Sequence, residues 1–126
     1  DGRARYFQRG VTWSKVSSGA PAFRSQPVGQ VFDVAGNGFF LDSPAGLNDL
    51  LAFCNSSTAQ AMLAALSPTL NFEAGQIAKL PVSTVRHKGV EGTADQLIST
   101  AKLDWDGSET SWDFAISPLV ALARSQ

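Results

Sequence analysis

Arginine and aromatic residues stand close together near the start of the chain, in the run Tyr6-Phe7-Gln8-Arg9-Gly10-Val11-Thr12-Trp13-Ser14. Arginine neutralises phosphate groups and aromatic rings stack on bases, so this combination is typical of a surface that binds nucleic acid. Residues 1–30 carry five Lys and Arg side chains against one acid, whereas residues 31–126 carry five against ten. The alternative interpretation is a solvated strand face that carries a few arginines without a nucleic-acid partner.

Charge and strand position indicate which side chains would face DNA. Lysine and arginine can neutralise phosphates, and arginine can also bind the edge of guanine through two hydrogen bonds. Trp13 can stack on bases, although a tryptophan in the middle of a strand is usually part of a hydrophobic core. The predicted DNA-binding residues are Arg5, Arg9, Trp13, Lys15 and Arg24, with Arg86 and Lys88 in a second contact loop.

Other kinds of site find little support in the residue types. One His and one Cys cannot form a zinc site, and the acidic residues lack the spacing of a calcium loop. A Ser-His-Asp triad would need His87, which stands between two cations in a polar segment. Gly36-Asn37-Gly38 lacks the helix and lysine that follow a phosphate-binding loop. We therefore expect no catalytic, cofactor-binding or metal-binding residue in this chain.

Carboxylates alternate with aromatic residues between residues 104 and 114. Paired carboxylates can serve acid–base catalysis, but Trp105, Trp112 and Phe114 are interleaved with these. This pattern is more typical of an amphipathic docking segment. The acidic balance of residues 31–126 also opposes DNA binding. A protein–protein docking module without direct DNA binding is therefore the alternative function.

The composition predicts one folded domain with a real core. The chain has 126 residues, of which 44% are hydrophobic. Cys54 stands in an apolar run, which favours a buried structural thiol over a nucleophile. No segment is apolar over the 18 or so residues that a membrane span needs, and no signal peptide is present. We expect a cytoplasmic protein without a membrane partner, and a fragment of a longer chain because Asp1 opens in a strand-like pattern.

Apolar residues recur at a strand-like spacing in some segments and at a helical spacing in others. These two patterns predict an α+β fold in which a small mixed β-sheet packs with helices. Branched and aromatic residues between turn residues predict strands at about 11–16, 22–25, 30–35, 39–42 and 69–72. The stretch Ala35-Gly36-Asn37-Gly38 predicts a tight hairpin turn. Apolar residues at helical spacing predict an αα-hairpin at about 47–66 and a C-terminal helix at about 93–103.

Several motifs follow one another along the chain: 6–14, Phe23-Arg24, Val31-Phe32-Asp33-Val34, Leu50 to Ser56, Pro68 to Ile77 and Leu80-Pro81. Their order resembles a target-recognition domain of adenine-specific DNA methyltransferases. The strand–helix–Leu-Pro layout is shared with type I specificity subunits and type IIG enzymes. The tail from Asp104-Trp105-Asp106 to Glu109-Thr110-Ser111-Trp112-Asp113-Phe114 is the more specific part and is similar to the PglX-type enzymes of BREX phage-defence systems.

The resemblance implies a sequence-recognition module for phage defence or restriction-modification. Residues 1–82 would form the target-recognition domain, and residues 83–126 a linker, a helix and an aromatic-acidic segment packed on it. Adenine methyltransferases carry an Asn/Asp-Pro-Pro-Tyr/Phe motif and a glycine-rich cofactor motif, and this chain has neither. S-adenosylmethionine is therefore implied for a catalytic domain upstream. The implied partners are double-stranded DNA, that upstream methyltransferase domain and other defence-system proteins.

Overall fold

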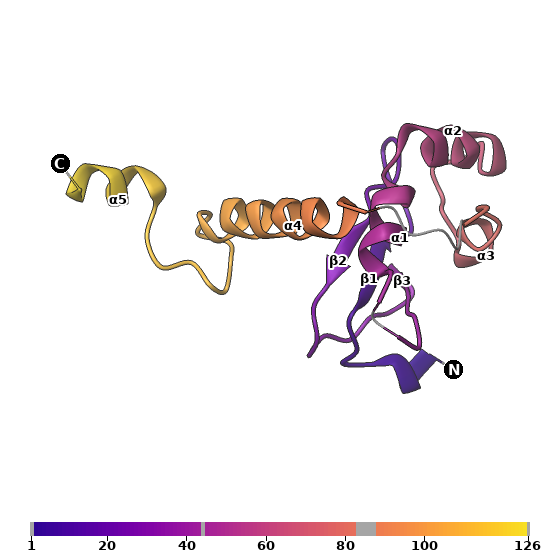
Figure 1. The fold of residues 1–126 in the computed structure, drawn as a ribbon, viewed down its shortest axis with the longest axis horizontal. Helices are drawn as coiled ribbons and strands as arrows, with labels where there is room; N and C mark the ends of the chain where they lie inside the picture. Colours follow the sequence, from indigo (N-terminus) through magenta and orange to yellow (C-terminus); the bar gives the residue numbers. More distant parts are fainter. Residues whose placement is uncertain (1, 44, 83–87, 126) are drawn as a thin grey trace. The chain divides into compact units, whose positions relative to one another are not determined.

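A computed structural model describes residues 2–43, 45–82 and 88–125 and confirms the α+β class. The described residues contain a three-stranded antiparallel sheet and helices (Figure 1). Contacts divide the chain into two compact units, Asp1–Glu91 and Gly92–Gln126. The predicted functional division after residue 82 stays a prediction.

The strand β1 (Gly10–Ser14) is central and pairs antiparallel with both β2 (Arg24–Gln26) and β3 (Gly36–Phe39). Its residue Thr12 lies opposite Arg24 on β2 and Gly38 on β3. Residues directly opposite each other in an antiparallel sheet point to the same face. The register therefore places these three residues in one row across one face of the sheet.

The two faces of the sheet have different chemistry. The core face carries Val11 and Trp13, which are 1% and 2% exposed, together with Phe39 of β3. The opposite face, which we call the outer face, has few large side chains of its own strands, but the Phe40 ring lies against Gly10 and Gly38. This face carries Gly10, Thr12, Ser14, Arg24, Gln26, Gly36 and Gly38. Gly10 and Gln26, at one end of this face, are buried.

The predicted αα-hairpin is confirmed by the helices α1 (Leu47–Cys54) and α2 (Ser57–Leu66). The Ser56 hydroxyl begins α2, because it accepts a hydrogen bond from the backbone N–H of Ala59. Helix α1 packs against β1 and against α2. The apolar side chains at the predicted helical spacing form the core: Leu47, Leu51, Cys54, Ala59 and Leu63 are all buried.

The prediction of a hairpin turn at residues 35–38 is wrong. The Asp33 carboxylate accepts hydrogen bonds from the backbone N–H groups of Ala35 and Gly36, so the chain turns before Gly36. The glycine-rich stretch is itself strand β3. Among the described residues, 30–35 contains no strand, and Val31 and Val34 are 60% and 76% exposed.

The predicted strand at 69–72 is reduced to an isolated bridge between Val16 and Asn71. Its backbone is nevertheless bonded to the end of the sheet, since the N–H of Phe72 donates to the carbonyl of Lys15. A short helix, α3 (Ala74–Ile77), follows directly, and its N-terminus is closed by a capping box of Glu73 and Gln76. Residues 68–70 form bends, so only Asn71 of this segment reaches the geometry of a bridge.

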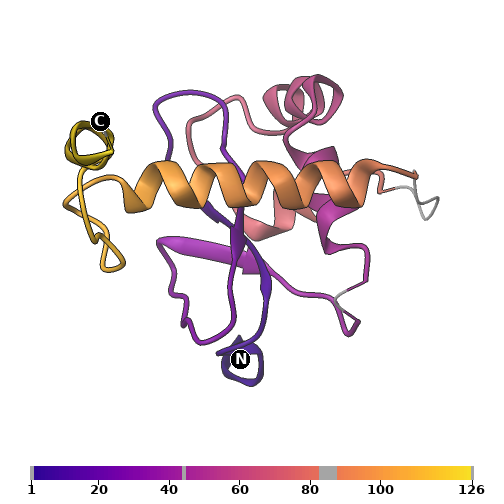
Figure 2. The ribbon, with the colours of Figure 1, turned by 60° about the vertical axis from the view of Figure 1, so that its left-hand side comes forward.

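The predicted C-terminal helix is confirmed as α4 (Val90–Asp106), which begins earlier and ends later than the apolar spacing indicates. Figure 2 shows it as one unbroken helix. A last helix, α5 (Pro118–Arg124), begins at a proline, which suits the first helical position. The short N-terminal 3-10 helix η1 (Gly2–Arg5) precedes the sheet. No described helix is long and apolar enough to cross a membrane.

Candidate nucleic-acid interface

Arg24 is the predicted contact residue that is most available to a partner. It is exposed and lies on the outer face beside Thr12. It forms no ion pair with any residue that the structure describes. The hydroxyl of Thr12 donates to the backbone carbonyl of Asn37, 2.8 Å away, so the residue opposite Arg24 is also bonded to β3 through its side chain.

Arg9 and Lys15 hold parts of the fold together instead of projecting freely. The Arg9 Nη2 atom donates to the Asn48 Oδ1 atom of α1, 2.9 Å away. The Lys15 Nζ atom lies 2.9 Å from Glu73 Oε1, and its side chain is only 29% exposed. The hydrogen bond from Lys15 is the main reason why the pKa of Glu73 is lowered. Both cations are therefore satisfied within the chain.

Arg5 forms a surface ion pair that a phosphate can replace. Its Nη2 atom lies 2.7 Å from Asp42 Oδ1, and the Asp42 side chain is 92% exposed. Ion pairs at such exposed sites contribute little to stability, about 0–1 kcal/mol. Exchange of Asp42 for a phosphate oxygen would therefore cost the fold little.

Trp13 does not face the surface, and its predicted role as a DNA-facing ring does not fit its position. The ring packs against Phe23 and Phe39, with centroid distances of 5.6 and 6.0 Å. Its indole Nε1–H donates to the backbone carbonyl of Phe72, 2.9 Å away. The alternation of β1 explains this, because Trp13 shares the buried face with Val11. The residue belongs to the core.

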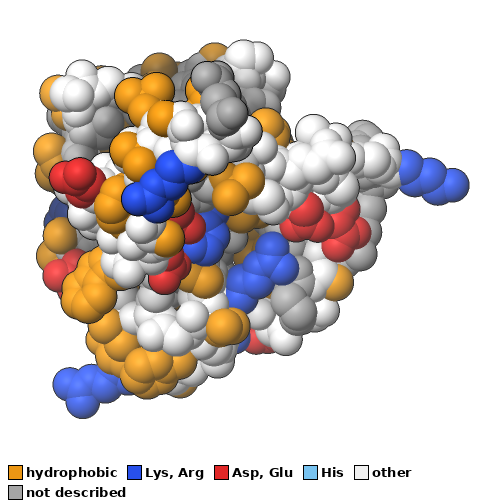
Figure 3. Space-filling model, turned by 90° about the vertical axis from the view of Figure 1, so that its left-hand side faces the viewer, with side chains coloured by type: hydrophobic (Ala, Val, Ile, Leu, Met, Phe, Trp, Pro, Cys, Tyr) orange, Lys and Arg blue, Asp and Glu red, His pale blue; other side chains and the backbone are white. Residues whose placement is uncertain are grey.

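The second predicted contact loop is described only in part. Lys88 is exposed and forms no ion pair with another described residue. Arg86 and His87 lie outside the described residues. On the face shown in Figure 3, Lys and Arg side chains are interspersed with acidic and hydrophobic ones and do not form one patch. The candidate interface is therefore described cation by cation.

One aromatic side chain near the predicted contacts was not singled out by sequence reasoning. Phe7 is 63% exposed and has a backbone φ of 65°. Its neighbour Tyr6 packs edge-on against Phe32, with ring centroids 5.0 Å apart. The aromatic run was visible in the sequence, but no spacing rule indicates a left-handed backbone at a phenylalanine.

The described residues offer little for catalysis. They contain no group of three or more His, Cys, Asp and Glu side chains that could hold a metal ion. Cys54 is buried, and this burial raises the pKa of its thiol to about 11. A thiol that stays protonated at neutral pH is a poor nucleophile.

We expect Cys54 to resist alkylation in the folded protein. Since its pKa of about 11 lies well above pH 8, almost no thiolate forms there, and the side chain is only 1% exposed. N-ethylmaleimide at pH 8 should modify the folded chain far more slowly than the chain in 6 M guanidinium chloride, as followed by mass spectrometry. Equal rates under the two conditions would show that the thiol is accessible.

Comparison with known proteins adds what the geometry alone does not provide. No model of a known protein family matches the chain. The chain is 36% identical over 114 residues, or 90% of its length, to the adenine-specific methyltransferase PglX of Lacticaseibacillus casei (strain Zhang). It is 35% identical over 117 residues, or 91% of its length, to the adenine-specific methyltransferase BrxX of Escherichia coli O9:H4 (strain HS). The chain spans about a tenth of the length of each of these relatives.

Proposed function

Since this chain is homologous over 90% of its length to a segment of the PglX-type adenine-specific methyltransferases, we propose that it is their DNA-recognition module. The parent protein would methylate the N6 atom of adenine as part of phage defence or restriction-modification. In this role the chain positions a DNA duplex through phosphate contacts. An upstream domain of the same protein then flips the target adenine and methylates it.

The exposed guanidinium of Arg24 is the structural observation that supports this proposal most directly. Around it, Gly36 leaves part of the outer face without a side chain, whereas the Phe40 ring lies against Gly38. A Cβ atom added at Gly36 would meet no atom nearer than 3.9 Å, so the surface there is open. A phosphate backbone can approach such a surface closely while the arginine neutralises it. Lys88 and the exchangeable Arg5 would add contacts elsewhere.

The described residues do not fit S-adenosylmethionine. Gly36 and Gly38 lie within strand β3, and the next helix, α1, begins only at Leu47, so these glycines do not form the turn into a helix N-terminus that would bind the cofactor. We therefore place no step of methyl transfer on this chain. Its own contribution is to bind and orient the duplex.

The double variant Arg24→Ala/Lys88→Ala is expected to weaken duplex binding in a salt-dependent way. Each lost phosphate contact lowers the slope of log K against log salt by about 0.9, so the slope should fall by about 2. Fluorescence anisotropy of a labelled duplex, titrated between 50 and 200 mM salt, measures both quantities.

The matched control is Lys79→Ala/Arg124→Ala. It removes the same two charge types from exposed positions that the proposal does not use. Equal losses of duplex affinity and salt slope in the two double variants would show that the effect comes from net charge alone. Unchanged affinity and slope in the first variant would exclude Arg24 and Lys88 as contacts.

A second candidate function, protein docking, is favoured by the surroundings of Trp112. This tryptophan is fully exposed, yet both of its neighbours are fixed. The hydroxyl of Ser111 donates to Asp106, and Asp113 lies 2.8 Å from the ammonium of Lys102. Exposed, fixed tryptophans are typical anchors of protein interfaces.

The hydrogen bonds to Asp106 and Asp113 raise the pKa of Lys102 to about 12, so the group stays charged at neutral pH. Residues 104–113 contain four acids and no cation, which suits a partner protein with a basic surface. The duplex titration separates the two functions, because a DNA-recognition module binds the duplex with an affinity that falls steeply with salt, whereas a docking module does not bind the duplex. If the unmodified chain shows no salt-sensitive duplex binding, docking becomes the better explanation.

A further inference from the structure

Phe7 has an unusual backbone conformation. Among the described residues it is the non-glycine residue with a positive φ, 65°. Bulky side chains rarely adopt this left-handed region, because Cβ approaches the neighbouring carbonyl oxygen. Two backbone hydrogen bonds hold Phe7 there. Its N–H donates to the Gln30 carbonyl at 2.8 Å, and its carbonyl accepts from the Gly29 N–H at 3.1 Å.

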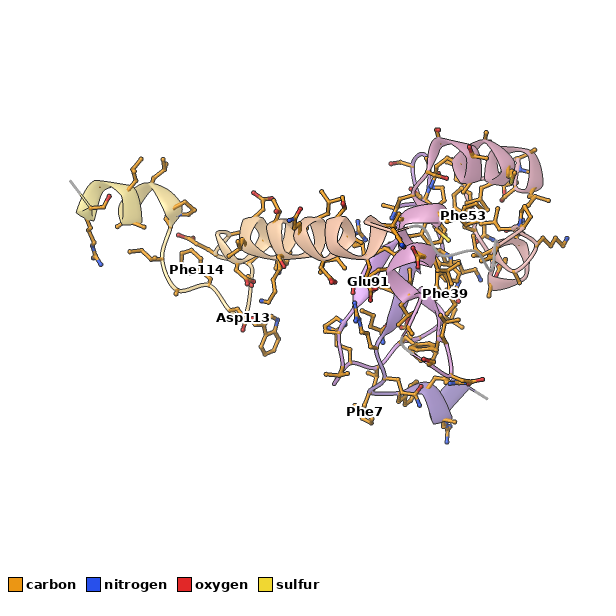
Figure 4. All side chains as sticks on the ribbon, viewed as in Figure 1. Phe7, Phe39, Phe53, Glu91, Asp113 and Phe114 are labelled. Carbon is orange, nitrogen blue, oxygen red and sulfur yellow. The ribbon has the colours of Figure 1, made fainter. Side chains whose placement is uncertain are left out.

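This conformation leaves the aromatic ring in solvent. The Phe7 residue is 63% exposed, and Figure 4 shows its side chain projecting from the ribbon. Its ring meets Tyr6 edge-on, with centroids 6.4 Å apart. Tyr6 in turn contacts Phe32, and Phe32 contacts Phe40, at 5.0 Å in each case. Phe7 is therefore the exposed end of a row of rings that is anchored on the sheet.

The charge next to Phe7 is positive. Residues 2–9 contain Arg3, Arg5 and Arg9 and no acid. Arg3 is exposed, and Arg5 pairs with the solvent-exposed Asp42 and also donates to the Gln8 Oε1 atom, 3.4 Å away. A fixed apolar ring with arginines on both sides matches the way in which DNA-bending proteins insert a wedge between base pairs. Strained, exposed residues of this kind are commonly found at functional sites.

We propose that Phe7 is a wedge that enters the base stack of duplex DNA and partly unstacks one base step. Arg3 and Arg5 beside it neutralise the adjacent phosphates, and the row of Tyr6, Phe32 and Phe40 keeps the ring from folding back. This inference rests on the proposed DNA-recognition function. It adds a specific means of contact, which the cations alone do not provide.

Duplexes that contain 2-aminopurine at successive positions test the wedge, because this base brightens when it is unstacked. With the full chain we expect a fluorescence increase at one base step. Phe7→Ala and Phe7→Gly should abolish the increase and weaken duplex binding by about tenfold, the usual loss for one base-stacking ring. Phe7→Leu should retain part of the fluorescence increase and part of the duplex affinity, since leucine also serves as a wedge.

Two controls separate folding from DNA contact. Glycine accepts a positive φ without strain, so Phe7→Gly should melt at or above the temperature of the unmodified chain. Val34→Ala removes another exposed apolar side chain and should leave both DNA signals unchanged. Salt-sensitive duplex binding that is unaffected in Phe7→Ala and Phe7→Leu would overturn the wedge and leave the proposed function standing. Absence of duplex binding by the unmodified chain would overturn both.

Discussion

Replacement of Trp13 by alanine is expected to lower the free energy of unfolding by about 3–5 kcal/mol. The side chain is 2% exposed and fills the space between Phe23 and Phe39. Its removal leaves a cavity and also leaves the Phe72 carbonyl without its indole donor. Since domains of this size are stable by about 5–15 kcal/mol, the variant should lose much of its stability. Urea denaturation followed by far-ultraviolet circular dichroism measures the change.

Two other tryptophan variants make this experiment specific. Trp13→Phe keeps an aromatic ring but loses the hydrogen bond to Phe72, so we expect an intermediate loss of stability. Trp112→Ala changes a fully exposed side chain and should stay within about 0.5 kcal/mol of the unmodified chain. A fully stable Trp13→Ala protein that had lost only DNA binding would contradict the core position and return Trp13 to the interface.

Gly10→Ala is expected to cost about 1–3 kcal/mol, although only a methyl group is added. A Cβ atom at this position would lie 2.6 Å from a ring carbon of Phe40 and 2.9 Å from the Phe39 carbonyl oxygen. The Phe40 ring can move, but the carbonyl belongs to the strand that pairs with β1. Thermal and urea denaturation should both show the loss.

A double-mutant cycle with Phe40→Leu identifies the cause of this loss. If the ring is the main obstacle, Gly10→Ala should cost less in the Phe40→Leu background, and the coupling energy should be of order 0.5–3 kcal/mol. Gly19→Ala is the matched control, because a Cβ atom there would meet nothing within 4 Å. Strictly additive effects of Gly10→Ala and Phe40→Leu would show that the contact with Phe40 does not determine the cost.

The helices could be predicted because their periodicity is local. Leu47, Leu51 and Cys54 face the core at the spacing that the sequence shows. Strand pairing is not local in the same way. Val31 and Val34 have strand-like character but remain exposed, because β1 already has β2 and β3 as its neighbours. The side chain of Asp33 then determines where the chain turns.

The sequence indicates which cations could form the candidate interface, but it does not indicate which of them are paired within the chain. Charge indicates that an arginine needs a partner, yet it does not show whether that partner lies in the chain or outside. Arg9 finds Asn48, 39 residues away, and Lys15 finds Glu73. Arg24 lacks such a partner among the described residues because its strand position points it to the outer face. These differences arise from tertiary packing, which composition does not contain.

The short edges of the sheet also affect how the chain folds in the presence of other polypeptide strands. The two edge strands have three residues in β2 and four in β3. Pro27, which has no backbone N–H, follows β2 directly. Short edges of this kind give other chains little template for strand addition, which is how natural sheets avoid aggregation. A sheet with such edges can fold without pairing with strands of other chains or domains.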